Sequence, residues 1–328
     1  MNVSVIVPVY NVADFVGECV RSVLDEADGG VELICVDDGS VDSSGMILDR
    51  LAAENRPGGC SMKVIHQKNA GAGAARNAAL AAATGDWIMF LDGDDVLAKG
   101  WLAVVRTMAE RHPSAQMLGF GRTESLPVVP VSPRPSREVD VSRVVGFDVY
   151  GRALWQFAYR RDLIDGLEFE HIIRVDDKLF QGAAVLRVSR AALMDGVQVY
   201  GYRQRESSIV HANWNRANFG AEISWRIRFI ESMEAAGKTM DRKLWRYMGL
   251  SFLEYIPRQL QDVSDSALRD ELECMWFDVV LKASRHDFAA WQRFVMRLLG
   301  TTRSRTAAWL LCRLPYAVKH LIHFGTLG

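Results

Sequence analysis

The stretch Asp92–Asp95, with the sequence DGDD, places three aspartates within four positions, directly after the apolar run Trp87–Leu91. Like charges this close repel one another, and no basic residue lies between Phe90 and Leu97 to offset them. One interpretation is a tight turn followed by a helix N-cap, both of which favour Asp. The other is a hard divalent cation, Mg²⁺ or Mn²⁺, which takes one or two carboxylates and completes its shell with water and substrate phosphates. A calcium loop is excluded, because the spacing DxDxDG is absent.

A second acidic cluster, in the segment 174–178 (RVDDK), contains Asp176 and Asp177. A positioned carboxylate can act as a general base that removes the proton of an attacking hydroxyl group. Two adjacent carboxylates raise each other's pKa, which suits that role. The alternative is a helix that begins here, because the helix macrodipole favours Asp in the first turn.

The elements that must position these groups alternate regularly in the first third of the chain. Apolar, β-branched runs alternate with segments of helical periodicity, which predicts a parallel sheet with helices on both faces. The βαβ crossovers of such a sheet are right-handed. The predicted strands are 3–9, 31–36, 64–66 and 87–91, and the predicted helices are 12–24, 46–53 and 72–83.

Polar residues stand at the carboxyl end of each predicted strand, where the ligands of such sheets bind. The four groups are therefore expected to meet at one substrate cleft. This placement favours the cation over the helix cap for the aspartates of DGDD. The groups are Pro8 with Tyr10, Asp37 with Asp38, Asn69, and the DGDD stretch itself.

Beyond the first third, the chain changes character twice. Four prolines between positions 127 and 135 predict an extended loop without regular helix over 123–148. Order resumes at 149–164 and in a strand at 197–202, and beyond about residue 213 the pattern is mainly helical. We therefore predict an α/β domain over 1–211 and a helical region over 212–328.

Composition limits the function further. The 328 residues carry a net charge of −1, which gives no general attraction to nucleic acid. Five scattered cysteines without CxxC spacing indicate reduced thiols and a cytosolic setting. No signal peptide is expected, since the chain opens with a predicted strand and lacks a basic n-region. No apolar stretch reaches the roughly 18 residues that span a bilayer, so any membrane contact is expected to be peripheral.

Four segments occur in an order and at intervals that resemble the nucleotide-sugar-binding half of family-two glycosyltransferases with the GT-A fold. The resemblance is clear over about the first 120 residues and continues more weakly, through YRRDLIDGLEFEHIIRVDDKLF and YGYRQRESSIVH, to about residue 211. It implies that 1–121 bind the nucleotide sugar and that 122–211 supply the acceptor side and the catalytic base. The four segments are VSVIVPVYNVADFVGECVRSVL, ICVDDGSVDSS, NAGAGAARNAAL and GDWIMFLDGDD.

The resemblance also implies roles on the donor side. Pro8, Tyr10 and Asp38 would line the pocket for base and ribose, with Tyr10 near the uracil. Asp92 would approach the ribose and the metal, and Asp94 would be the direct metal ligand.

The family's ARN motif is matched by Arg76 and Asn77. By the resemblance, its arginine supports the first aspartate of the Asp-x-Asp motif and the pocket floor. The sequence departs from the family at Gly73, where a small polar residue is usual before AARN.

On the acceptor side, DDKLF at 176–180 resembles the family's EDxxF segment, whose second acid lies beneath the acceptor hydroxyl. Asp177 matches that acid and would be the catalytic base. Asp176 replaces the first acid and is one methylene shorter, a departure that bears on acceptor geometry.

Tyr202-Arg203 with Ser207-Ser208 resembles the family's YR…S stretch, which approaches the diphosphate. Arg203 or Arg205 would clamp phosphate oxygens in a bidentate fork. His211 is a candidate third metal ligand, since imidazole suits manganese; an ordinary surface or packing histidine is the alternative.

Two further features have more than one interpretation. Trp155 and Tyr159 would either stack on a sugar ring or belong to the core. The segment 285–328 carries seven Lys or Arg and one acid among interleaved aromatic residues. Such basic helices suit an anionic membrane face, a solvated helical cap or a dimer interface.

We therefore predict an inverting glycosyltransferase that uses Mn²⁺ or Mg²⁺ and a nucleotide-diphosphate sugar, with UDP as the expected nucleotide. Its acceptor would be a glycan or lipid-linked hydroxyl in bacterial surface polysaccharide synthesis, in the cytoplasm or at the inner face of the plasma membrane. One alternative is a nucleotidyltransferase of sugar phosphates, although 10–14 lacks that class's glycine-rich basic loop. The other is a non-catalytic nucleotide- or glycan-binding module, which the intact Asp92, Asp94 and Asp177 disfavour. A dinucleotide-binding dehydrogenase is also disfavoured, because Arg76 stands at the third glycine position.

Overall fold

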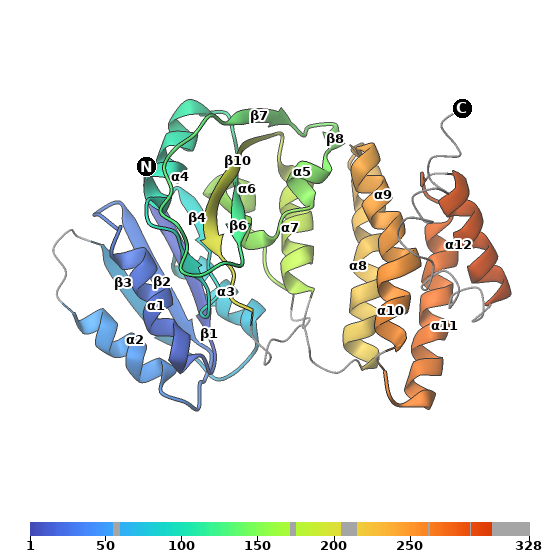
Figure 1. Ribbon diagram of the computed structural model, residues 1–328, viewed down its shortest axis with the longest axis horizontal. Coiled ribbons are helices and arrows are strands. Elements are labelled where there is room, and N and C mark those ends of the chain that lie inside the picture. The colour runs from blue at the N-terminus through green and yellow to red at the C-terminus, as the bar shows by residue number, and fades with distance from the viewer. Residues whose placement is uncertain (55–59, 171–174, 205–214, 262, 289, 304–328) are drawn as a thin grey trace. The chain divides into compact units, whose positions relative to one another are not determined.

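The computed structural model describes residues 1–54, 60–170, 175–204, 215–261, 263–288 and 290–303 (Figure 1). The chain forms two compact units. Unit 1 comprises 1–211 together with 237–239, and unit 2 comprises 212–236 and 240–328. Residues 237–239 therefore belong to unit 1 although they follow the start of unit 2 in the sequence.

The first four strands of unit 1 lie in the order β3-β2-β1-β4, and all three of their pairings are parallel. Helices connect them as the alternating pattern predicts. β1, β2 and β4 are apolar and largely buried, whereas β3, at the edge of the sheet, is partly exposed. The strands are β1 (Val3–Val9), β2 (Val31–Asp37), β3 (Ser61–His66) and β4 (Trp87–Phe90). The helices are α1 (Ala13–Leu24), α2 (Ser44–Ala53) and α3 (Ala72–Ala82).

The second half of the sheet is mixed, and here the structure goes beyond the predicted parallel order. The path continues β4-β9-β6-β10-β5, with β9 antiparallel to both of its neighbours. β6 and β10 are parallel, while β5 and β7 each pair antiparallel with β10. The strands are β5 (Val96–Leu97), β6 (Met117–Thr123), β7 (Arg137–Asp140), β9 (Phe157–Arg160) and β10 (Arg190–Gly201).

Short helices carry the chain between these strands. The described part of the proline-rich segment 123–148 contains the strands β7 and β8 (Val144–Val145) in otherwise extended chain, and a helix begins only at Phe147. The second acidic cluster opens a helix of its own, α7. The helices are α4 (Trp101–Arg111), α5 (Phe147–Tyr150), the 3-10 turn η1 (Leu154–Gln156), α6 (Arg161–Ile164) and α7 (Asp176–Arg187).

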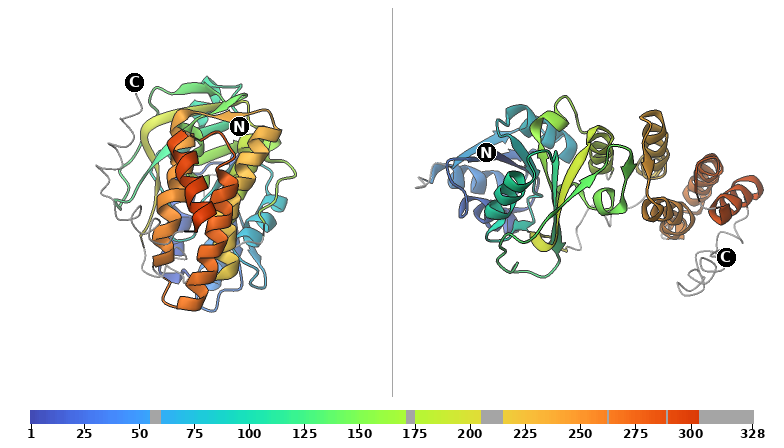
Figure 2. Two further views of the ribbon diagram at one scale, coloured as in Figure 1. Left: turned by 90° about the vertical axis from the view of Figure 1, so that its right-hand side faces the viewer. Right: turned by 90° about the horizontal axis from the view of Figure 1, so that it is seen from above.

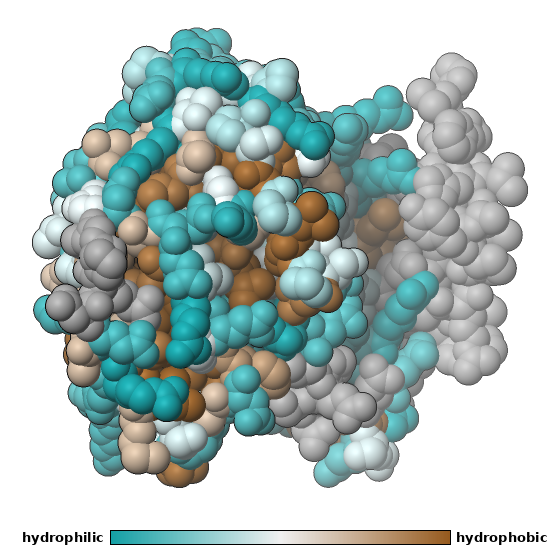
Figure 3. Space-filling view, turned by 60° about the vertical axis from the view of Figure 1, so that its left-hand side comes forward, coloured by the Kyte–Doolittle hydropathy of each residue, from teal (hydrophilic) through white to brown (hydrophobic). Residues whose placement is uncertain are grey.

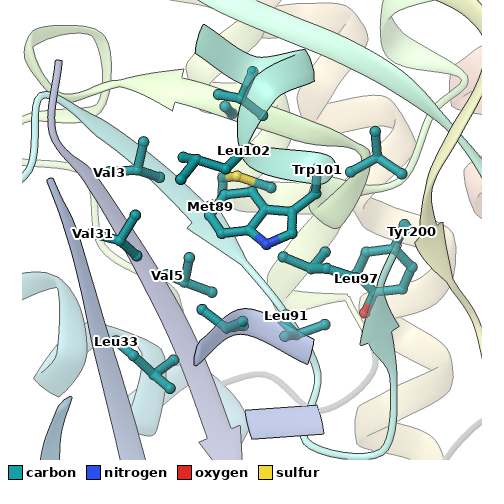
Figure 4. Close-up of a cluster of buried hydrophobic side chains, with 14 of the residues drawn as sticks. Val3, Val5, Val31, Leu33, Met89, Leu91, Leu97, Trp101, Leu102 and Tyr200 are labelled. Atoms are coloured by element: carbon teal, nitrogen blue, oxygen red, sulfur yellow. The ribbon is translucent and has the colours of Figure 1, made fainter. Parts of the chain in front are cut away.

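One large hydrophobic core lies between the sheet and the helices α1 and α4 (Figure 4). Side chains of alternate strand positions, among them Val3, Val5 and Leu33, point into it, as the period of two in a strand requires. Trp101 of α4 and Tyr200 of β10 belong to the same cluster, and both are fully buried. The sheet ends that carry the polar residues are thus built on a rigid, close-packed base.

Hydrophobic side chains reach the surface of unit 1 in patches among hydrophilic ones (Figure 3). Tyr10, which directly follows β1, is 48% exposed, and Val41, beyond the end of β2, is 86% exposed. An aromatic ring exposed at a strand end is available to a ligand.

The regular structure of unit 2, within its described residues, is helical apart from Met240, which ends the short strand β11 (Thr239–Met240); the helical character agrees with the sequence prediction (Figure 2). Three of the described helices begin where Asn215, Asp241 and Asp265 accept hydrogen bonds from the first turn. No helix within the described ranges is both long and apolar enough to cross a membrane. Residues 304–328, which belong to the predicted helical region, lie outside them. The helices are α8 (Arg216–Ala235), α9 (Arg242–Leu250), the π-turn η3 (Ser251–Tyr255), α10 (Ile256–Gln261), α11 (Ser266–Ala283) and α12 (Ala290–Thr302).

Candidate active site

The carboxyl ends of β1, β2 and β4 lie side by side, so the polar residues that follow them gather at one sheet edge. In register, Val9 faces Asp37, and the Asp38 amide donates to the Val9 carbonyl at 2.8 Å. On the other side of β1, the Leu91 amide donates to the Ile6 carbonyl at 2.9 Å. The convergence expected from parallel topology is therefore present.

The DGDD stretch forms a turn in which the Asp95 amide donates to the Asp92 carbonyl at 3.0 Å. A side chain at Gly93 would place its Cβ 3.0 Å from the Pro8 carbonyl oxygen, so the turn fits closely against the end of β1. The next helix, α4, begins at Trp101 after Gly100. The aspartates therefore do not cap a helix, and the helix-cap interpretation is wrong.

Asp95 is the buried member of the three aspartates, with 2% of its surface exposed. Its Oδ2 accepts a hydrogen bond from the Tyr200 hydroxyl at 2.6 Å, and its Oδ1 accepts one from the Arg203 amide at 2.7 Å. Burial, together with the negative charges of Asp92 and Asp94, raises the pKa of Asp95 to about 8. A divalent cation in the turn would relieve this crowding of charge.

Arg76, on α3, joins the two acidic clusters. Its guanidinium donates to Asp92 Oδ1 at 2.8 Å and to Asp176 Oδ2 at 2.9 Å, and it lies over the Phe169 ring. Burial lowers the pKa of Arg76, but the two carboxylates outweigh that effect and hold it above its ordinary value. Burial also raises the pKa of Asp176 to about 6, although the Arg76 charge opposes the rise.

Asn77, the next residue on α3, holds the segment that leads to the second cluster. Its Nδ2 donates to the Phe169 carbonyl at 2.9 Å, and its Oδ1 accepts from the Phe169 amide at 2.8 Å. At Gly73, a Cβ would lie 3.2 Å from the Glu170 carbonyl oxygen and 3.3 Å from Asp176 Oδ2. The departure from the family pattern at Gly73 thus coincides with a close approach of the segment around Glu170 and Asp176 to α3.

Asp177 lies beside Asp176 in the first turn of α7. Its Oδ1 accepts from the Lys178 amide at 2.8 Å, and its side chain is partly exposed. The segment is therefore a helix start, as the alternative interpretation expects, and a helix start is equally able to present a base.

The residues predicted to line the donor side differ in their contacts. The carboxylate of Asp38 is 2% exposed and accepts hydrogen bonds from Gln67 and from the amides of Ala70 and Gly71. It therefore fixes the loop before α3, a contact that sequence reasoning did not foresee. Pro8 is partly exposed, and Asn69 is exposed, with its backbone close to Gly39.

Asp37 is held by two neighbours on the same side of the sheet. Its carboxylate accepts from the Ser40 amide at 3.0 Å and contacts His66 Nδ1 at 2.9 Å. The other ring nitrogen of His66 lies 3.0 Å from Asp49 Oδ1. These hydrogen bonds raise the pKa of His66.

Arg203 lies directly after β10, against the DGDD turn. Its Nε donates to the Asp94 carbonyl at 2.9 Å, its Nη2 donates to Glu18 at 2.7 Å, and its guanidinium lies over the Phe15 ring. His211, the candidate third metal ligand, lies outside the described residues, as do Arg205, Ser207 and Ser208.

The two candidate sugar-stacking aromatics differ. Tyr159 is fully buried and belongs to the core. Trp155 is partly exposed and stacks on Tyr200, with ring centroids 4.2 Å apart, and on Tyr202 at 5.7 Å.

The carboxylates of the DGDD turn fit a hard divalent cation that takes most of its ligands from water and phosphate. Within the described residues no group of three or more His, Cys, Asp or Glu is arranged to hold a metal ion. Asp92 and Asp94 offer two carboxylates in one turn, which suits Mg²⁺ or Mn²⁺ when water and phosphate oxygens complete the shell.

Comparison with known proteins agrees with this geometry. Residues 4–166 match the model of the family described as Glycosyl transferase family 2. The chain is 30% identical over 231 residues to the uncharacterized glycosyltransferase EpsJ of Bacillus subtilis, which covers 66% of this chain and 64% of EpsJ. It is 24% identical over 248 residues to the glycosyltransferase GlyG of Streptococcus pneumoniae, covering 70% of this chain and 77% of GlyG. The chain spans a little under two thirds of EpsJ and of the putative glycosyltransferase EpsH, at 64% and 62% of their lengths.

Two solved structures show the same fold at low sequence identity. The S. aureus TarS fragment 1–349 in complex with UDP has a TM-score of 0.72 at 18% identity, covering 95% of this chain and 90% of that one. The mannosyltransferase PcManGT from Pyrobaculum calidifontis, in complex with GDP-Man and Mn²⁺, has a TM-score of 0.51 at 18% identity, covering 94% and 83%.

Proposed function

Since this chain belongs, through residues 4–166, to glycosyl transferase family 2, we propose that it transfers a sugar from a UDP-sugar to an acceptor hydroxyl with inversion at the anomeric carbon. The acceptor would be a glycan or lipid-linked glycan of bacterial surface polysaccharide synthesis. The observation that carries the proposal is the Arg76 guanidinium, which joins the DGDD turn to the start of α7. The turn that would bind the diphosphate and the helix start that would bind the acceptor are thus joined through one side chain.

The leaving diphosphate requires positive charge. Asp92 and Asp94 would hold Mn²⁺ or Mg²⁺, and the ion supplies Lewis-acid neutralisation of the phosphates. Arg203, whose Nε donates to the Asp94 carbonyl, would add hydrogen bonds to phosphate oxygens. Tyr10, exposed after β1, would stack on the base.

The acceptor hydroxyl must lose its proton as its oxygen attacks the anomeric carbon. Asp176 forms an ion pair with Arg76, whereas Asp177 Oδ2 has no hydrogen-bond partner among the described residues. Asp177 is therefore the carboxylate of the pair that would take the proton. One base is enough for a single displacement, and the sugar leaves with inverted configuration.

The two alternatives, a nucleotidyltransferase and a non-catalytic binding module, would use the same residues differently. A nucleotidyltransferase would attack a phosphorus atom and would have no use for a base at Asp177. A non-catalytic module would bind nucleotide without turnover. The partners and the location at the inner face of the membrane stay predictions.

The decisive experiment combines binding with turnover. Melting temperatures are measured with UDP-, GDP- and dTDP-sugars, each with Mn²⁺ and with EDTA, and release of the nucleoside diphosphate is then followed by chromatography. We expect one UDP-sugar to stabilise the protein only when metal is present, by about 2.7 kcal/mol at a hundredfold excess over its Kd. Release of UDP in the presence of an acceptor supports transfer. With pyrophosphate added instead of an acceptor, formation of UTP and sugar 1-phosphate supports the nucleotidyltransferase, which would run in reverse from a UDP-sugar. Binding without either reaction supports the module.

A further inference from the structure

We propose that Tyr200 is a positioning residue that sets the geometry of the DGDD turn for the divalent cation. The inference rests on the proposed function, because it assumes that Asp92 and Asp94 hold that ion. The Tyr200 side chain would not itself touch the metal or the substrate.

The Tyr200 hydroxyl joins the two ends of the turn. It donates to Asp95 Oδ2 at 2.6 Å and accepts from the Asp92 amide at 3.2 Å. Asp94, the expected direct ligand, lies between these two anchored residues in the sequence. The hydroxyl therefore fixes both the backbone before Asp94 and the side chain after it.

Asp95 depends on this contact. Its carboxylate is buried, and within the described part of the chain only the Tyr200 hydroxyl and the Arg203 amide donate to it. A buried carboxylate that loses one of its hydrogen-bond donors is destabilised, because desolvation is no longer offset, so the turn would rearrange. The hydrogen bond between Asp95 and Tyr200 thus attaches the turn to β10.

The Tyr200 ring has little freedom to move. Tyr200 pairs with Leu97 of β5 across the antiparallel ladder, and the two side chains lie together in the core (Figure 4). Trp155 stacks on the ring from the acceptor side, with centroids 4.2 Å apart. Gly201 leaves no space for a side chain, because a Cβ there would overlap Val128. Strand pairing and stacking together hold the hydroxyl in place, which is the requirement for a group that orients metal ligands.

The test uses Tyr200→Phe, which removes the hydroxyl and keeps the ring. Tyr159→Phe is the matched control, since Tyr159 is equally buried in the same sheet and its hydroxyl donates to the Leu154 carbonyl at 3.1 Å, away from the turn. Binding of Mn²⁺ in the presence of UDP is followed in each protein by thermal shift and by the loss of the free-ion EPR signal. Neither readout depends on turnover.

We expect Tyr200→Phe to raise the half-saturating Mn²⁺ concentration about tenfold or more, as for other residues that orient metal ligands. Tyr159→Phe should leave that concentration within about twofold of wild type, even if both variants melt at lower temperature. Equal Mn²⁺ dependence in the two variants would overturn the proposal. So would failure of Tyr200→Phe to fold, which would assign the hydroxyl to folding alone. Wild-type protein that shows no Mn²⁺-dependent response to any nucleotide would instead refute the proposed function, and this inference with it.

Discussion

Arg76 and Asp176 lie 100 positions apart in the chain and form a buried ion pair of 2.9 Å, with side-chain exposures of 9% and 13%. The same guanidinium contacts Asp92 at 2.8 Å. The planar fork of an arginine holds two carboxylates in a fixed geometry, whereas a lysine offers a point charge on a flexible stem. The helix α3 therefore fixes the distance between the turn and the start of α7.

Replacing Arg76 with Met should lower the free energy of unfolding by about 3–5 kcal/mol, because two carboxylates would lose their buried cation. Arg106→Met is the control, since Arg106 pairs with Asp28 at side-chain exposures of 30% and 52% and should lose only about 0–1 kcal/mol. Urea denaturation measures both. Equal losses would mean that Arg76 stabilises the site no more than a surface ion pair does.

Asp177→Asn should reduce sugar transfer at least about 100-fold and leave UDP binding nearly unchanged, because the amide cannot accept the acceptor's proton. Turnover and thermal shift with UDP and Mn²⁺ are measured on the same protein. Asp176→Asn is the paired variant, and it should retain more activity, since it changes a contact to Arg76 and leaves the base in place. If the two variants lose equal activity, Asp177 has no special role in proton transfer.

Tyr10→Ala should weaken UDP binding by about 1.4 kcal/mol, or tenfold in Kd, through loss of stacking on the base. Val41→Ala provides the control, because Val41 is the more exposed of the two, at 86% against 48%, and has no expected contact with the base. Calorimetry with UDP compares them. An unchanged Kd for Tyr10→Ala would place the uracil elsewhere.

His66 predicts a dependence of stability on pH. Hydrogen bonds to the carboxylates of Asp37 and Asp49 raise its pKa, so the protonated ring is favoured in the folded state. Its stabilising contribution is complete below the unfolded pKa of about 6.5 and is lost as pH rises through the folded value. The advantage of wild type over His66→Gln in urea denaturation should therefore be larger at about pH 5.5 than at about pH 9. An advantage of the same size at both would show that the imidazolium does not contribute.

The elements of the donor half could be predicted because their signals are local. β1, β2 and β4 are apolar runs bounded by turn residues, and β3 adds the apolar pair Val64 and Ile65. The rule for parallel sheets brings the polar residues at the strand ends together. The antiparallel β9 could not be predicted, because Phe157–Arg160 is too short to show a period of two and its partners are fixed only by the assembled sheet.

The sequence predicted which residues belong to the candidate site better than it predicted the contacts between them. The resemblance implies that Arg76 supports Asp92, but nothing in the sequence says that the same guanidinium also contacts Asp176. Tyr200 received no role from the sequence, since its hydroxyl reaches Asp95 only when the fold brings together two residues 105 positions apart. The roles in catalysis and binding given to these residues stay predictions for the experiments above.

Lys238, far along the chain, binds the C-terminal end of α7, the helix that carries the expected base Asp177. Its ammonium donates to the carbonyls of Val185 and Val188 at 3.2 and 2.6 Å, where α7 ends. A protein shortened to its first 211 residues would lack this cation, and the last turn of α7 would be left to fray. A fragment that is to keep α7 intact must therefore extend beyond residue 211, where the predicted α/β domain ends, and include Lys238.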